Sequence, residues 1–224
     1  MKKILVLLVF IFSSCQIEYD GETKIVVKGK IVDSNNNPII NKEVNLYVTR
    51  DQISIPFVFY LPSETNNIGK TNTNNNGEYT MVIPKPENNF TEIIVVTNAT
   101  STDYNKKQFR NIQLNNFDNF ELNLPISKLY NESELTTLNI TLNQVTQNVE
   151  LRDITLLGTV INEIEYINMP ENFSFYNQLE SIVKKNQTII LRYTLFNYST
   201  NITSIIEENV VINDENLVSF TLNY

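Results

Sequence analysis

The chain has no histidine and no tryptophan, and it has only one cysteine and five glycines among 224 residues. Without histidine it lacks the commonest general base and the commonest ligand of transition metals. Ser-His-Asp catalysis, Cys-His catalysis and zinc sites of the usual Cys/His type are therefore excluded. A single cysteine cannot form a disulfide within the chain. These absences favour a protein without catalytic residues, metal site or other cofactor.

Asparagine is abundant instead, with 35 residues in the chain. Its side chain builds Asx-turns and its backbone tolerates positive φ angles, so asparagine can take the place of glycine at turns. Acidic residues also exceed basic ones. The formal charge is −8 for the whole chain and becomes −10 when Lys2 and Lys3 are removed. This charge argues against binding of nucleic acid or of anionic lipid headgroups.

The amino terminus has the parts of a secretory signal peptide. Lys2 and Lys3 precede nine apolar residues, 4–12, and two serines then lead to Cys15. Nine apolar residues are too few to cross a bilayer, which needs about 20. A cysteine at the cleavage point resembles the lipobox of bacterial lipoproteins, although Phe12 stands where leucine is usual. The resemblance implies a signal peptide over 1–14 and a diacylglycerol on the thiol of Cys15.

A lipid on Cys15 would attach the mature chain to a membrane, and we predict that this is the outer membrane, with exposure of the chain at the cell surface as one option. An ordinary signal peptide with an incidental cysteine is the alternative. Residues 15–23 are predicted to be a lipidated tether, made acidic by Glu18, Asp20 and Glu22. This stretch is either a plain linker or an export tag, because acidic residues at this place resemble a cell-surface signal in one group of Gram-negative bacteria.

Short alternating segments separated by turns make up the first half of the mature chain. Residues 24–32, 44–48 and 78–83 alternate between apolar and polar positions. Residues 74–77, Asn-Asn-Asn-Gly, are a tight-turn signal. We find no pattern of an amphipathic helix between these segments. Short strands separated by turns are typical of an antiparallel β-sandwich.

Three motifs in this half resemble those of the carboxypeptidase regulatory-like domain, a transthyretin-like β-sandwich. In chain order they are Gly29-Lys30-Ile31-Val32-Asp33, Pro38-Ile39-Ile40-Asn41-Lys42-Glu43-Val44, and Thr73-Asn74-Asn75-Asn76-Gly77-Glu78-Tyr79 followed by Ile83-Pro84. The resemblance covers residues 24–126 and implies one domain there. Two features depart from the family pattern. Residues 50–67 form a longer insertion, and Asp103-Tyr104 stands where a Gly-aromatic pair is expected.

A polar, turn-forming stretch over 125–135 predicts the boundary of a second domain, 127–224. Strand patterns follow over 137–145, 149–160, 188–196 and 217–224. Residues 175–185 predict one helix of about three turns, with Leu179, Ile182 and Val183 on one side. We predict a second β-sandwich here, Ig-like or similar. The whole chain is thus predicted to be all-β, with two antiparallel β-sandwich domains.

Two apolar, aromatic segments are candidates for a binding site. Their residues are Ile55, Phe57, Phe59 and Tyr60 in the insertion, and Phe173, Phe175 and Tyr176 in the second half. Exposed apolar patches on loops often mark contact sites. The alternatives are that the insertion is only an added strand, or that the two segments pack on each other between the domains.

Carboxylates are the remaining catalytic candidates. Their spacing does not distinguish them from ordinary charged residues on the surface of a strand. Glu150 and Asp153 lie in a strand-like run, and Glu163 and Glu165 are two residues apart. A glycosidase needs two carboxyl groups across a cleft, one with a raised pKa. The run from Asn72 to Gly77 imitates a calcium loop, but Ile83 stands where the bidentate glutamate is needed. A turn is the preferred interpretation of that run.

These observations predict a non-enzymatic lipoprotein of the cell envelope. We expect a structural or accessory subunit that is anchored through Cys15 and binds a protein complex of the outer membrane. A surface module that binds glycan or peptide ligands is the second hypothesis. We expect deletion of 54–61 to abolish partner binding without unfolding the first domain.

Overall fold

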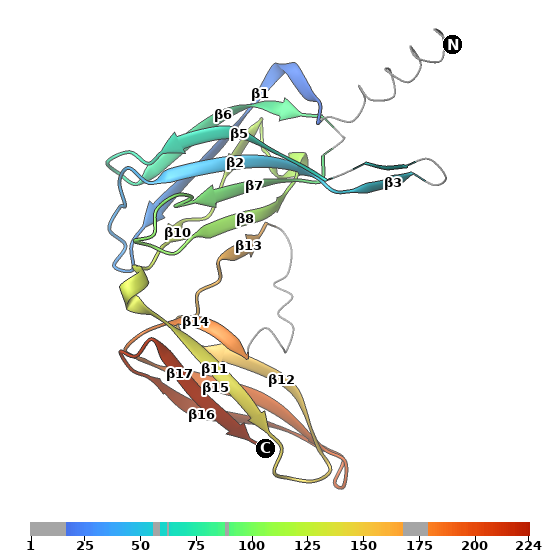
Figure 1. Cartoon of the computed structure of the whole chain (residues 1–224), viewed down its shortest axis with the longest axis vertical. Coiled ribbons are helices and arrows are strands. Elements are labelled where there is room, and N and C mark those ends of the chain that lie inside the picture. The colour runs from blue at the N-terminus through green and yellow to red at the C-terminus, as the bar shows by residue number, and fades with distance from the viewer. Residues whose placement is uncertain (1–16, 56–58, 62, 88–89, 168–178) are drawn as a thin grey trace. The chain divides into compact units, whose positions relative to one another are not determined.

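The computed structural model describes residues 17–55, 59–61, 63–87, 90–167 and 179–224 (Figure 1). The chain forms two compact units. Unit 1 comprises the chain up to Leu129 together with Ile164–Met169, and unit 2 comprises Tyr130–Glu163 and Pro170–Tyr224. The first unit ends at Leu129, whereas the sequence predicted that the first domain ends at residue 126. The segment Ile164–Met169, which comes later in the sequence, also belongs to unit 1.

The prediction of an all-β fold is confirmed. In the part of the chain that the structure describes, the helical segments are two single 3-10 turns, η1 (Leu114–Asn116) and η2 (Glu132–Glu134). None of the described helices is long and apolar enough to span a membrane. The helix predicted over 175–185 is wrong where it can be compared, because Glu180–Lys184 is the strand β14. Residues 168–178 lie outside the described residues.

Unit 1 is built from two sheets. The first contains β10-β1-β6, with β9 also paired to β1, and the second has the order β13-β8-β7-β2-β5. The strands of the first sheet are β1 (Tyr19–Val32), β6 (Glu78–Pro86), β9 (Glu121–Asn123) and β10 (Ser127–Lys128). Those of the second are β2 (Glu43–Arg50), β5 (Glu64–Asn72), β7 (Glu92–Thr97), β8 (Lys107–Ile112) and β13 (Ile164–Tyr166).

Alternation along these strands places every second residue in the core of unit 1. Ile25 and Val27 of β1 are fully buried, as are Leu46 of β2, Val95 of β7 and Phe109 of β8. Both sheets therefore contribute to one hydrophobic cluster. The sheets are mixed, because β9 and β10 pair with β1, and β13 with β8, in parallel. The predicted antiparallel pairing is found for β1 with β6, for β2 with β5 and β7, and for β7 with β8.

The start of the described chain is folded into unit 1. Ile17 is 4% exposed and belongs to the core cluster, and β1 begins at Tyr19. The side chain of Asp20 accepts hydrogen bonds from the backbone N–H groups of Glu22 and Thr23 and from the hydroxyl of Thr23. Residues 17–23, which the sequence assigned to a tether, are held in place by the burial of Ile17 and by this turn.

Unit 2 is smaller than unit 1 and consists of two three-stranded sheets. One has the order β14-β11-β17 and the other β12-β15-β16. The strands are β11 (Leu135–Asn143), β12 (Val149–Leu157), β14 (Glu180–Lys184), β15 (Gln187–Asn197), β16 (Ile202–Ile212) and β17 (Leu217–Asn223). Ile189, Leu191 and Tyr193 of β15, within the strand predicted over 188–196, are buried in the core of unit 2. The pair β11 and β17 is parallel.

Asparagine takes the role of glycine in the turns of both units. Among the described residues, nine non-glycine residues have a positive φ angle, and eight of them are asparagines. They are Asn36, Asn41, Asn98, Asn111, Asn119, Asn148, Asn186 and Asn201. The prediction drawn from the asparagine excess is thus confirmed, since the αL region costs asparagine less than most side chains.

Candidate functional site

The insertion of unit 1 forms a separate two-stranded ribbon, β3 (Ile53–Ile55) and β4 (Phe59–Leu61). The two strands are antiparallel and pair with each other, and they join neither sheet of unit 1. Figure 1 shows this ribbon projecting away from the sandwich at the ends of β2 and β5. We refer to β3 and β4 as the ribbon. The insertion thus adds two strands, which pair with each other among the described residues.

The structure places three of the predicted binding residues in the ribbon. Ile55 and Phe59 are directly opposite each other, and Tyr60 pairs with Ser54. Phe57 lies outside the described residues, as do Phe173, Phe175, Tyr176 and the proposed lipid attachment site Cys15. The ribbon therefore brings Ile55, Phe59 and Tyr60 together, and the role predicted for all of these residues stays a prediction.

The root of the ribbon is fixed by a charged residue of β5. Glu64 accepts a hydrogen bond from the backbone N–H of Ile17 through Oε2 at 3.1 Å. The same oxygen lies 3.1 Å from Nη2 of Arg50, whose side chain is only 6% exposed. Nearby, the backbone N–H of Glu87 donates to the carbonyl of Glu18 at 2.8 Å. The beginning of the chain and both ends of the ribbon thus meet at one place.

An open hollow of about 360 Å³ lies on the outer face of the five-stranded sheet and reaches this root. Its floor includes Tyr47, Ile94 and Val96, which project from β2 and β7, and Arg110 from β8. Its remaining lining residues are Thr49, Arg50, Asp51, Ser63, Glu64, Thr65 and Gln108. We call this hollow the root groove. It combines a half-buried apolar strip with charged edges, which is the composition of a contact surface.

The arginines of the root groove are held by carboxylates. Arg110 is in ion contact with Glu92, and Nε of Arg110 donates to Oε1 of Glu92 at 3.1 Å. Oε2 of Glu92 accepts the backbone N–H of Asn111 at 2.5 Å. These pairs are structural, because each carboxylate is engaged by a guanidinium group and a backbone N–H. Sequence reasoning missed the root groove because its residues come from four strands distant in the sequence.

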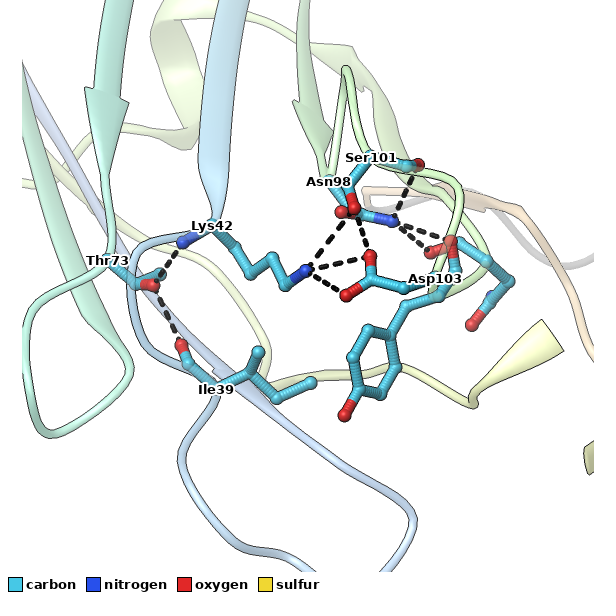
Figure 2. Close-up of polar contacts among 8 residues, drawn as sticks. Ile39, Lys42, Thr73, Asn98, Ser101 and Asp103 are labelled. Atoms are coloured by element: carbon cyan, nitrogen blue, oxygen red, sulfur yellow. Dashed lines mark hydrogen bonds and ion pairs between the residues drawn. The ribbon is translucent and has the colours of Figure 1, made fainter. Parts of the chain in front are cut away.

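A second polar cluster closes the opposite end of β2 (Figure 2). Nζ of Lys42 lies 2.8 Å from Oδ1 and 2.6 Å from Oδ2 of Asp103, and 5.0 Å from the ring centre of Tyr104. Ser101 also donates to Asp103. The ammonium group of Lys42 and the hydroxyl of Ser101 hold the pKa of Asp103 below its usual range. The cluster joins the hairpin motif to the Asp103-Tyr104 loop.

One member of each candidate carboxylate pair is engaged by neighbouring side chains. Hydrogen bonds from Arg152 and Tyr198 lower the pKa of Glu150, and Glu165 forms an ion pair with Lys107 at 2.9 Å. A general acid needs a raised pKa instead. No group of three or more metal-binding side chains occurs among the described residues.

The asparagine run that imitates a calcium loop is a turn in the structure. Oδ1 of Asn74 accepts backbone N–H groups of Asn76 and Glu78 at 2.8 and 3.0 Å. Gly77 has a φ angle of +72°, and a Cβ atom there would lie 2.4 Å from the carbonyl oxygen of Ile31. The side chain that would have to bind calcium is thus used by its own backbone, as an Asx-turn requires.

No protein-family model and no curated protein matches the chain. Among solved structures, the 3-chlorocatechol 1,2-dioxygenase of Rhodococcus opacus 1CP aligns with 52% of this chain and 62% of its own, at 13% identity and a TM-score of 0.34. The shaft pilin SpaA of Lactobacillus rhamnosus GG aligns over 90% and 98%, at 9% identity and a TM-score of 0.33.

The Bacillus anthracis TIE protein aligns with 90% of this chain and 34% of its own, at 14% identity and a TM-score of 0.32. The matched part is thus less than two thirds of the dioxygenase and about one third of the TIE protein. Likenesses at such low TM-scores carry no argument about activity, ligand or partner.

Proposed function

We propose that the protein is a lipid-anchored, non-enzymatic accessory protein of the outer membrane, which binds a protein partner of the cell envelope. The observation that carries this proposal is the burial of Ile17, two residues after the lipobox cysteine. A folded unit that begins so close to the anchor would be held at the membrane surface. Several acyl chains on one residue anchor a protein stably, because each buried CH₂ contributes about 0.8 kcal/mol.

The proposal of a non-enzymatic role is supported by six acidic side chains whose charged form is stabilised by hydrogen bonds. Asp20, Asp33, Glu43, Asp103, Glu121 and Glu150 each have a pKa below the usual range, because hydrogen bonds stabilise the charged form. Groups of this kind are poor general acids. Together with the absence of histidine from the sequence, this favours binding over catalysis.

The root groove is the surface that we assign to the partner. It is open, it lies on a rigid sheet, and its apolar strip of Tyr47, Ile94 and Val96 is flanked by Arg50 and Arg110. Arginine and aromatic residues are enriched in the centres of protein interfaces. A protein segment laid across the sheet would cover the apolar strip between the two arginines.

The anchor is tested by a Cys15→Ser variant expressed in the native host. We expect the parent chain in the outer-membrane fraction and the variant outside it. The groove is tested by chemical cross-linking in intact membranes with Ile94→Glu, and with Ile205→Glu as the matched control, because Ile205 is 70% exposed on β16 of unit 2. A specific adduct lost only with Ile94→Glu supports the proposal. An adduct that persists in both variants refutes the groove.

A further inference from the structure

Phe120 is the single residue other than asparagine and glycine that has a positive φ angle in the part of the chain that the structure describes. Its φ is +65°, and that of the preceding Asn119 is +48°. Asp118 and Glu121 on either side exchange two backbone hydrogen bonds, of 2.9 and 2.8 Å. A two-residue hairpin loop of this kind needs positive φ at both central residues and prefers asparagine followed by glycine. Phenylalanine therefore stands where glycine is favoured, in a conformation that is strained for a residue with a Cβ atom.

Burial in the core does not offset this strain. Phe120 is 56% exposed, whereas Leu114 and Phe117 of the preceding turn pack against the core cluster of unit 1. The backbone of Phe120 has a structural role, because its carbonyl oxygen accepts the N–H of Val26 at 2.8 Å. Any residue could supply that carbonyl group. Backbone strain that persists in a fold is found mainly at functional sites, so the exposed ring calls for a function.

Phe120 lines an open hollow of about 440 Å³ in unit 1. We call it the turn hollow, and its lining residues are Ile25, Lys85, Leu114, Phe117, Asn119 and Phe120. Four of these six residues are apolar, and two of the four are phenylalanines. Ile25, at 1% exposed, belongs to the core cluster, so the turn hollow reaches the core of unit 1. Aromatic rings pair favourably with one another, and the two phenylalanines suit an aromatic side chain as the occupant.

Lys85 is the one charged residue that lines the turn hollow. It takes part in none of the ion pairs found among the described residues. The hydroxyl of Thr23 and the backbone of its turn lower the pKa of Asp20 most, and Lys85 contributes least to that shift. An occupant with a carboxylate beside its aromatic side chain would therefore complement both the apolar lining and the ammonium group.

We infer that the turn hollow docks a segment of a protein partner in which an aromatic residue stands next to an aspartate or glutamate. The aromatic side chain lies against Phe117 and Phe120, and the carboxylate pairs with Lys85. A protein segment is favoured over a small ligand because the turn hollow is open, whereas pockets for small ligands enclose most of the ligand surface. The inference goes beyond the proposed function, since it concerns a second surface and depends on neither the lipid anchor nor the root groove.

The test uses the mature chain, residues 15–224, kept soluble by Cys15→Ser. The probe is the peptide acetyl-Gly-Ser-Phe-Asp-Ser-Gly-amide, titrated into the ¹⁵N-labelled chain while the amide signals of the turn are followed. Phe120→Ala, Phe120→Gly and Lys85→Gln are compared with the parent. Asn148→Gly is the matched control, because Asn148 is an exposed residue of unit 2 with a φ of +60°. Urea unfolding of every variant is recorded beside the titration.

We expect Phe120→Ala and Phe120→Gly to weaken binding equally, by about tenfold, because both remove the ring. Lys85→Gln should weaken binding about twofold to fivefold, as the loss of an exposed ion pair would. Asn148→Gly should bind like the parent. Phe120→Gly should unfold at a higher urea concentration than Phe120→Ala, and at no lower a concentration than the parent, because glycine adopts positive φ without strain.

Failure of the peptide to bind the parent, or undiminished binding to Phe120→Gly, overturns the inference. So does a Phe120→Gly chain that is less stable than the parent, because the ring would then serve the fold. Peptides with alanine for phenylalanine, or asparagine for aspartate, must bind more weakly, and equal binding contradicts the assigned chemistry. Phenylacetate that competes at the same concentration as the peptide would assign the turn hollow to a small anion. A parent dimer that Phe120→Gly dissociates would assign it to a second copy of the chain.

Discussion

The backbone N–H of Ile17 donates a hydrogen bond to Oε2 of Glu64 at 3.1 Å, across 47 residues of sequence. This contact joins the beginning of the folded chain to the first residue of β5. No free linker therefore lies between Ile17 and the first unit. The ribbon, the root groove and the proposed lipid therefore belong to one end of unit 1.

Loss of this contact should loosen the start of the chain. In Glu64→Ala, the N–H of Ile17 and the guanidinium group of Arg50 lose a charged acceptor. A hydrogen bond to a charged group contributes about 1.5–3 kcal/mol, so we expect a lower free energy of unfolding by about that amount. Faster hydrogen exchange at Ile17 is the specific signature. The control is Glu207→Ala, which removes a half-exposed ion pair with Arg192. This variant should change the free energy of unfolding little, because exposed ion pairs contribute little to stability.

Gly29 should tolerate no side chain. A Cβ atom there would lie 2.3 Å from the hydroxyl oxygen of Tyr79, which is opposite Gly29 in the register of β1 and β6 and is 3% exposed. Overpacking of this kind costs about 1–3 kcal/mol, so Gly29→Ala should lower the midpoint of urea unfolding. Gly21→Ala is the matched control, because no atom lies within 4 Å of its Cβ position. Equal midpoints for the two variants would contradict this packing.

The turn at Asp20 should make the stability of the fold depend on pH below about 4. Hydrogen bonds from the side chain of Thr23 and the backbone of Glu22 and Thr23 lower the pKa of Asp20 to about 2. Because this folded-state pKa is depressed, the group stabilises the fold above the unfolded pKa of about 3.9, and that stability is lost as pH falls toward 2. An NMR titration of the Asp20 carboxyl carbon should give this pKa, and Thr23→Ala should raise it. An ordinary pKa would show that the segment is a loose tether.

Clear alternation in the sequence was sufficient to predict β1, β6 and β15, since each contains a run in which every second residue is buried. It failed for β14, where Leu179, Ile182 and Val183 have helical spacing. In the structure Val183 is buried and Ile182 is 38% exposed, as alternation in a strand dictates. It also missed β16, whose first six residues include no buried position, so the strand has little periodic signal there.

The candidate site was predictable only in part. The apolar insertion can be recognised from its sequence, and in the structure it forms the two-stranded ribbon. The strand β13 was missed because it has three residues and pairs with β8 about 56 residues away in sequence. The root groove was missed because strands far apart in the sequence supply its floor. Positions that meet only through tertiary pairing leave no local signal.

The amino-terminal peptide of the protein isolated from its native host tests the central claim most directly. Mass spectrometry of that peptide should show a chain that begins at Cys15 and carries a diacylglycerol on the thiol, two residues before the buried Ile17. A bare thiol, or an amino terminus at another residue, would contradict the account, because unit 1 would then have no lipid to hold its root groove at the membrane.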